Sequence, residues 1–91
     1  MRLKNNTNTL VSYEAIGYTQ RRFLPAGAEA TLRLPTPATI TMVRQDDGLL
    51  EVMSMPTEKS GILAVSLDEA TTLTDNQGVL RIQPDGQVFL N

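Results

Sequence analysis

The chain has 91 residues, which suits one small domain, residues 1–91, and leaves no room for a second core. It lacks cysteine, histidine and tryptophan, which excludes disulfides, thiolate or imidazole metal ligands and serine–histidine catalysis. Apolar residues make up 41% and charged residues 20%, an ordinary globular composition that argues against disorder. The formal net charge of −2 argues against a general nucleic-acid-binding protein.

The charge is unevenly distributed along the chain. Residues 1–45 contain six Lys and Arg against two Asp and Glu, whereas residues 46–91 contain two against eight. Strands from distant segments often interleave in β-proteins, so two interpretations stay open at this point. The charges are either scattered over the surface or form a polar molecule with complementary ends.

The N-terminal segment shows no secretory signal, because Met1–Lys4 is followed by the polar run Asn5–Thr9 and not by an apolar region. The most apolar stretch, Ile62–Leu67, is too short to span a bilayer. We therefore expect a protein that works inside a cell, or inside a particle assembled there, without contact to a membrane.

Short segments of alternating apolar and polar residues, the pattern of half-buried strands, run through the chain. In Ala38–Val43, for example, Ala38, Ile40 and Met42 share one face. Turn residues separate the segments every eight to twelve positions. The predicted strands are Met1–Lys4, Leu10–Gly17, a short one in Thr19–Leu24, Ala28–Leu34, Ala38–Arg44, Leu49–Met55, Thr71–Thr74, Val79–Gln83 and Gln87–Leu90.

The turn residues predict how these strands connect. Gln45–Gly48 should join its two neighbours as a hairpin in which Gly48 takes a positive φ. Asp75–Gly78 and Gln83–Gly86 should form the turns of a C-terminal meander. One helical turn is predicted at Ser66–Ala70, where Ser66 could cap it. The fold class is all-β: a small antiparallel β-sandwich or a partly open β-barrel with a C-terminal meander.

The segment Leu49–Met55 is largely apolar on both faces, with Leu50 and Val52 on one and Leu49, Met53 and Met55 on the other. Burial inside a barrel or under a loop explains this pattern. A subunit interface that uses the adaptable methionine side chains explains it as well.

Tyr18–Phe23 places two aromatic residues around Arg21 and Arg22, as base-stacking platforms for single-stranded nucleic acid do. An oligonucleotide-binding barrel is therefore an alternative. The acidic net charge makes nucleic acid an improbable partner, and Phe23 alternates with Arg22 in a way that favours a core position.

Nothing in the sequence selects a catalytic or cofactor site. The adjacent carboxylates Asp46–Asp47 and Asp68–Glu69 would point to opposite faces of a strand and could not easily share a metal ion. No serine has an activating histidine, and no glycine-rich phosphate loop is present. We expect neither an enzyme nor a cofactor.

The segment from Ser60 to Val65, the acidic pair Asp68–Glu69 and the run Ala70–Thr74 resemble part of the head-decoration (cement) proteins of tailed bacteriophages. The chain's helix-poor, cysteine-free composition, rich in Thr, Ala and Pro, is similar too. The resemblance covers residues 60–74 and transfers no functional residue. It implies a small β-rich protein that clamps neighbouring capsid subunits.

These observations predict a structural or assembly protein, most concretely a bacteriophage virion component for capsid decoration or at the head–tail junction. It would reside in the virion or the host cytoplasm, bind capsid or other virion subunits and form homo-oligomers. The six Arg against two Lys support this role, because arginine is preferred at interfaces. A small inhibitor or adaptor of a host protein is the alternative. The predicted interface residues are Arg21, Arg22, Asp46, Asp47, Met53 and Met55.

Overall fold

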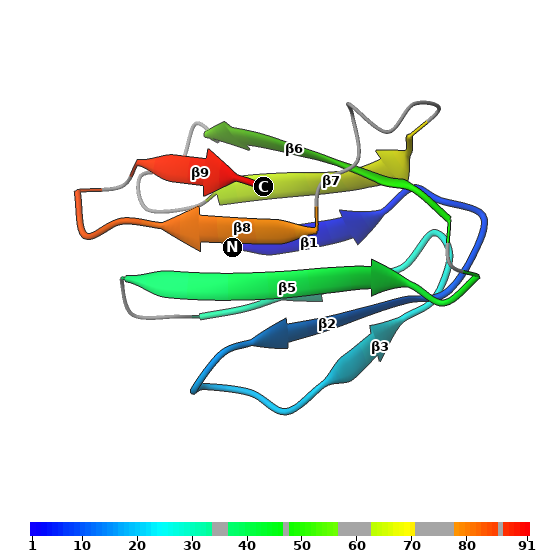
Figure 1. Ribbon diagram of the computed structural model, residues 1–91, viewed down its shortest axis with the longest axis horizontal. Coiled ribbons are helices and arrows are strands. Elements are labelled where there is room, and N and C mark those ends of the chain that lie inside the picture. Colours follow the sequence, from blue (N-terminus) through cyan, green and yellow to red (C-terminus); the bar gives the residue numbers. More distant parts are fainter. Residues whose placement is uncertain (34–36, 47, 57–62, 71–77, 86) are drawn as a thin grey trace.

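The computed structural model describes residues 1–33, 37–46, 48–56, 63–70, 78–85 and 87–91. In this part of the chain all regular elements are strands, which lie in two layers (Figure 1). The strands are β1 (Arg2–Asn5), β2 (Val11–Ala15), β3 (Arg22–Leu24), β4 (Glu29–Thr31), β5 (Ala38–Arg44), β6 (Leu50–Pro56), β7 (Leu63–Glu69), β8 (Val79–Ile82) and β9 (Val88–Leu90).

The strands form two open sheets. Sheet A has the order β4-β1-β7-β6, and sheet B has the order β3-β2-β5-β8-β9. Neighbouring strands are antiparallel except β1 and β7, which are parallel. Among the described strands neither sheet closes into a barrel, so the predicted all-β, sandwich-like fold is confirmed.

The facing sides of the two sheets enclose one hydrophobic core. Sheet A contributes Leu3 and Leu67, and sheet B contributes Val11, Ile40 and Leu80, all of them almost fully buried. The alternation predicted for β5 is confirmed, since every second residue from Ala38 to Met42 is buried. The strands form because their period of two places these apolar side chains on the inner face.

The prediction of a helical turn at Ser66–Ala70 is wrong, because β7 extends to Glu69. Strand β7 is paired on both sides, with β1 and with β6. These two ladders and the inward position of Val65 and Leu67 outweigh a local capping pattern that would stabilise one turn only.

The prediction of a hairpin at Gln45–Gly48 is also wrong. Strand β5 belongs to sheet B and β6 to sheet A, so this connection crosses from one sheet to the other. Gly48 does not adopt a positive φ; among the described glycines only Gly17 and Gly27 do. The side chain of Arg44, described below, accounts for the glycine at this position.

At the C-terminus, β5, β8 and β9 form successive antiparallel pairs. The predicted hairpin between β8 and β9 is confirmed, and Gln83 N donates to Gln87 O at 2.8 Å to close it. The predicted strand Thr71–Thr74, most of the turn Asp75–Gly78 and Gly86 lie outside the described residues.

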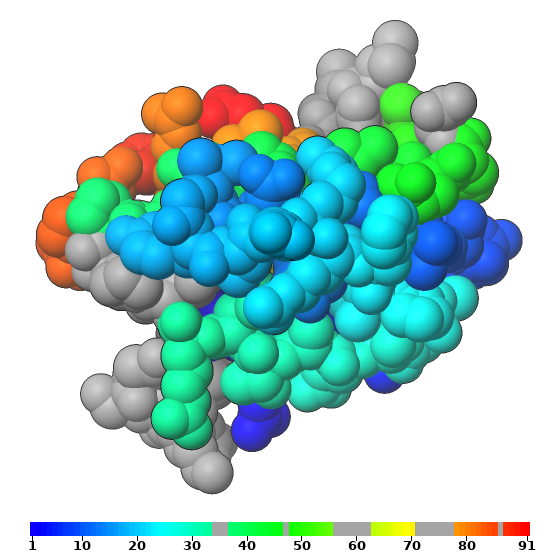
Figure 2. Space-filling view, turned by 90° about the horizontal axis from the view of Figure 1, so that it is seen from below, coloured from blue at the N-terminus to red at the C-terminus, as the bar shows by residue number. Residues whose placement is uncertain are grey.

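The two halves of the sequence occupy two sides of the molecule. In sheet A, β4 and β1 lie next to each other, as do β7 and β6; in sheet B, β3, β2 and β5 lie together, followed by β8 and β9. Seen from below, the surface consists mainly of residues from the first half, coloured blue to green-cyan (Figure 2). Within the described strands, β1–β5 carry four Arg or Lys against two Glu, whereas β6–β9 carry one Arg against three Asp or Glu, so the strands follow the uneven charge of the sequence.

Candidate protein-binding surfaces

The outer face of sheet B exposes large apolar side chains. The register sets Ser12 of β2 between Phe23 of β3 and Val43 of β5, and all three point away from the core. Ile16 and Phe89 are exposed farther along the same face, next to Thr39 and Arg81. We use the name sheet B face for the surface formed by the apolar residues Ile16, Phe23, Val43 and Phe89 together with Arg21 and Ser12.

Phe23 was predicted as a core residue, and this prediction is wrong, because 57% of it is exposed. Its partner in the register is Ser12, on the outer face, whereas the next residue, Leu24, pairs with Val11 and is buried. In β3 the residue after Phe23, and not Phe23 itself, has the inward position.

A polar network fixes the centre of the sheet B face. Arg21 Nη1 donates to Ser12 Oγ at 2.7 Å, and Gln45 Nε2 donates to the same oxygen at 2.9 Å. Arg21 Nε also lies 3.9 Å from Glu14 Oε1. These contacts fully bury Ser12 and hold Arg21 across the strand. Nothing in the sequence singled out Ser12, because a serine in a strand is usually a solvated outward residue.

Arg22 is exposed on β3, the outermost strand of sheet B, and Tyr18 is 52% exposed in the connection that precedes it. Arg21 and Phe23 are exposed as well, so the segment 18–23 contains two exposed aromatic and two exposed basic residues, although Arg22 pairs with Tyr13 and Phe23 with Ser12 on opposite faces of β2. Tyrosine and arginine are the residue types that contribute most to binding energy at protein interfaces.

Asp46 is bound within the molecule. Arg44 holds its carboxylate with two bonds, Nε to Oδ1 at 3.0 Å and Nη2 to Oδ2 at 2.6 Å, and Gly48 N donates to Oδ1 at 2.9 Å. The hydrogen bonds from Arg44 and then from Gly48 lower the pKa of Asp46. Asp46 therefore supports the crossing from β5 to β6, and Asp47 lies outside the described residues.

Met53 and Met55 lie on the outer face of sheet A and are 50% and 62% exposed. Their partners on β7 are the small residues Ser66 and Ala64, and β6 is an edge strand of sheet A, so no large side chain of a paired strand covers them among the described residues. The interpretation that these methionines are buried is wrong, and their role in an interface stays a prediction.

The predicted interface residues do not converge on one site. Arg21 and Arg22 lie at the β3 side of sheet B, Asp46 lies in the crossing between the sheets, and Met53 and Met55 lie on the β6 side of sheet A. The arrangement therefore offers two separate surfaces, the sheet B face and the methionine-bearing strand β6.

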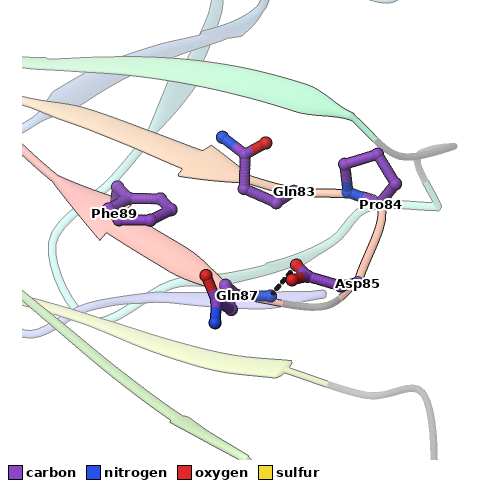
Figure 3. A pocket seen from close by; sticks show the side chains of 5 residues that line it. All are labelled: Gln83, Pro84, Asp85, Gln87 and Phe89. Atoms are coloured by element: carbon purple, nitrogen blue, oxygen red, sulfur yellow. Dashed lines mark hydrogen bonds between the residues drawn. The ribbon is translucent and has the colours of Figure 1, made fainter.

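A shallow pocket lies at the hairpin between β8 and β9, lined by Gln83, Pro84, Asp85, Gln87 and Phe89 (Figure 3). Its one carboxylate accepts a hydrogen bond from Gln87 N at 3.1 Å, which stabilises the turn. Within the described ranges, no three carboxylate residues gather in a way that could hold a metal ion. The same part of the chain contains no helix of the length and apolarity that a membrane span requires.

Comparison with known proteins adds no relative to this description. No family model, no curated protein and no solved structure matches the chain.

Proposed function

We propose that this chain is a structural assembly protein without enzymatic activity, which binds other proteins through the sheet B face. The observation that carries this proposal is the exposure of Phe23 and Val43 on either side of the buried Ser12. Exposed apolar patches on small proteins with a polar surround mark interaction sites. Ser12 and Glu14 hold the side chain of Arg21 in place in the free protein. Binding of a partner to this cation therefore requires little further loss of side-chain entropy.

The resemblance of residues 60–74 to head-decoration proteins supplies the setting. We propose that the partners are subunits of a tailed-bacteriophage virion, with the chain acting in capsid decoration or at the head–tail junction. Repeated partner surfaces would then bind many copies of a small rigid domain, without a chemical step.

The replacement of both apolar residues by serine should abolish this binding. We expect F23S/V43S to bind purified tailed-phage heads at least about tenfold more weakly than the wild type does. The loss of both apolar contacts would weaken the binding free energy by more than about 1 kcal/mol. Co-sedimentation with the heads measures the affinity. M55S is the matched control, since Met55 is as exposed as Phe23 but lies on the other sheet. Equal binding by F23S/V43S and wild type, or no saturable binding at all, would contradict the proposal.

The exposure of Phe23 favours a second candidate, the binding of single-stranded nucleic acid. Tyr18 and Phe23 both offer an aromatic face next to Arg21 and Arg22, as stacking platforms do. The net charge of −2 opposes this function, because it repels phosphate.

A labelled oligothymidine distinguishes the two candidates. A nucleic-acid platform should bind it with an affinity that falls steeply with salt, and Y18A/F23A should weaken binding by about tenfold or more. Fluorescence anisotropy at two salt concentrations measures both effects. Absence of binding at low salt removes this candidate and leaves the protein-binding role.

A further inference from the structure

The pocket at the hairpin between β8 and β9, here named the hairpin pocket, combines an aromatic ring with several hydrogen-bonding groups. Figure 3 shows Phe89 at one end of it, Pro84 and Asp85 at the other, and Gln83 and Gln87 between them. Its volume of about 450 Å³ lies within the range of small-molecule sites. The hairpin pocket therefore has the size and the mixed polarity of a ligand site.

The alternation of the two strands turns these side chains outward. Val88 packs against the core, so its neighbours Gln87 and Phe89 lie on the outer face of sheet B. Gln83 lies opposite Gln87 and donates its main-chain N–H to Gln87 O at 2.8 Å. Phe89 is 49% exposed, so its ring presents an apolar surface beside the two glutamines.

The free polar groups of the hairpin pocket are of the kind that binds hydroxyls. Within the described ranges no hydrogen bond uses the side-chain amide of Gln83 or of Gln87. Each amide offers two N–H donors and one C=O acceptor. Asp85 accepts Gln87 N with Oδ1 at 3.1 Å, which leaves Oδ2 to accept from a ligand. A ligand with several hydroxyls suits these groups, because every hydroxyl both donates and accepts.

We propose that the hairpin pocket binds a neutral saccharide, with one face of a hexopyranose ring against Phe89 and its hydroxyls hydrogen-bonded to Gln83 and Gln87. A pyranose presents C–H groups on its faces and hydroxyls around its rim, and an aromatic ring attracts such C–H groups with its electron-rich face. An acidic sugar would lie next to Asp85, the one charged residue that lines the pocket. Arg81 is the partner of Phe89 in the register but does not line the pocket.

The main chain of the hairpin argues against a peptide as the ligand. Extended peptides bind to sheets mostly through main-chain hydrogen bonds. In the hairpin pocket Gln83 N already donates to Gln87 O, and Gln87 N already donates to Asp85. The side chains are left to bind the ligand, which suits a sugar.

An NMR titration of the isotope-labelled protein tests this proposal with the methyl hexopyranosides of glucose, galactose, mannose and N-acetylglucosamine. We expect at least one of them to shift the side-chain amide signals of Gln83 and Gln87 with a Kd on the order of 1 mM, because an open pocket covers only part of a monosaccharide. Signals of sheet A, such as that of Met53, should not move. No saturable shift with any of these sugars up to about 20 mM would overturn the proposal.

Variants identify the groups that bind. F89L should weaken binding by about fivefold or more, since leucine keeps the apolar bulk without an aromatic face, whereas F89W should retain binding. Q83A and Q87A should each weaken binding by about threefold through the loss of a hydrogen bond. F23L is the matched control, because Phe23 is the other phenylalanine of the chain, lies on the same sheet and is 57% exposed. Equal weakening by F89L and F23L would contradict the assigned site.

This inference does not rest on the proposed binding of phage heads, although Phe89 also belongs to the sheet B face. F23S/V43S should bind the methyl glycoside as the wild type does, while its binding to heads is lost. Head binding without a saccharide shift rejects this inference alone. A saccharide shift together with equal head binding by F23S/V43S and wild type rejects the proposed function alone.

Discussion

N5D should lower the free energy of unfolding by about 3 kcal/mol at neutral pH, although it exchanges one NH2 group for one oxygen. Asn5 is completely buried at the end of β1. Its Nδ2 donates to Thr9 O at 2.9 Å and to Leu24 O at 2.8 Å, and its Oδ1 accepts from Thr7 N at 3.0 Å. Leu24 belongs to sheet B, so this side chain connects the two sheets. The aspartate of the variant would direct a carboxylate oxygen at two carbonyl oxygens.

The pH dependence of N5D separates this cause from a general loss of packing. Burial and the two carbonyl oxygens favour the protonated form of the introduced carboxyl, so its pKa in the folded state is raised above that of the unfolded chain. In this pH range the folded variant therefore binds more protons than the unfolded variant does. Its loss in free energy of unfolding relative to wild type should become smaller as the pH falls from 7 to about 4.

Urea unfolding followed by circular dichroism measures the effect, with N6D as the matched control. Asn6 is the exposed neighbour of Asn5, and its substitution should change stability by no more than about 0.5 kcal/mol at either pH. A pH-independent deficit in N5D, or a deficit of equal size in N6D, would contradict the role of Asn5 as the connecting side chain.

Asn5 also shows where sequence reasoning reaches its limit. The run Asn5–Thr9 is polar and lies between two predicted strands, yet the structure buries Asn5 and Thr7 within it. The spacing of an asparagine two residues before a threonine does permit the local bond from Thr7 N to Asn5 Oδ1. The bond to Leu24 cannot be predicted in this way, because it depends on how the two sheets stack.

The strands themselves could be predicted where alternation alone decides the structure. The prediction for Ala38–Arg44 coincides with β5, and the hairpin between β8 and β9 follows from Pro84 and Asp85 in its turn. The predictions were wrong where pairing with a neighbouring strand determines the conformation of a segment or the direction of its side chains. Register with Ser12 turns Phe23 outward, and two flanking strands extend β7 through Ser66–Glu69. Neither cause is local in the sequence.

For the candidate surfaces, too, the pattern within one strand could be predicted, whereas the effect of the neighbouring strands could not. The pattern of Leu49–Met55 set Leu50 and Val52 on one face and Met53 and Met55 on the other, and the structure shows that the first pair points inward. Whether that second face is covered depends on the position of β6 at the edge of sheet A, which only the topology reveals.

The crossing from β5 to β6 depends on the absence of a side chain at Gly48, and G48A should therefore lower the free energy of unfolding by about 2 kcal/mol. A β-carbon at this position would lie 2.5 Å from Cζ of Arg44. The Arg44 side chain is only 10% exposed, and Nη1 donates to Leu49 O at 2.8 Å besides its two bonds to Asp46. The guanidinium could make room for the methyl group only by giving up these bonds.

A double-mutant cycle with R44A tests this cause directly. In the R44A background the obstacle is gone and Gly48 has no positive φ, so G48A should become neutral or even stabilise by a few tenths of a kcal/mol through the unfolded chain. G17A is the matched control: Gly17 has a φ of 83° and open space around it. Its cost of about 1 kcal/mol should be the same in both backgrounds. Additive costs for G48A and R44A would show that Gly48 serves the crossing for a reason other than the guanidinium of Arg44.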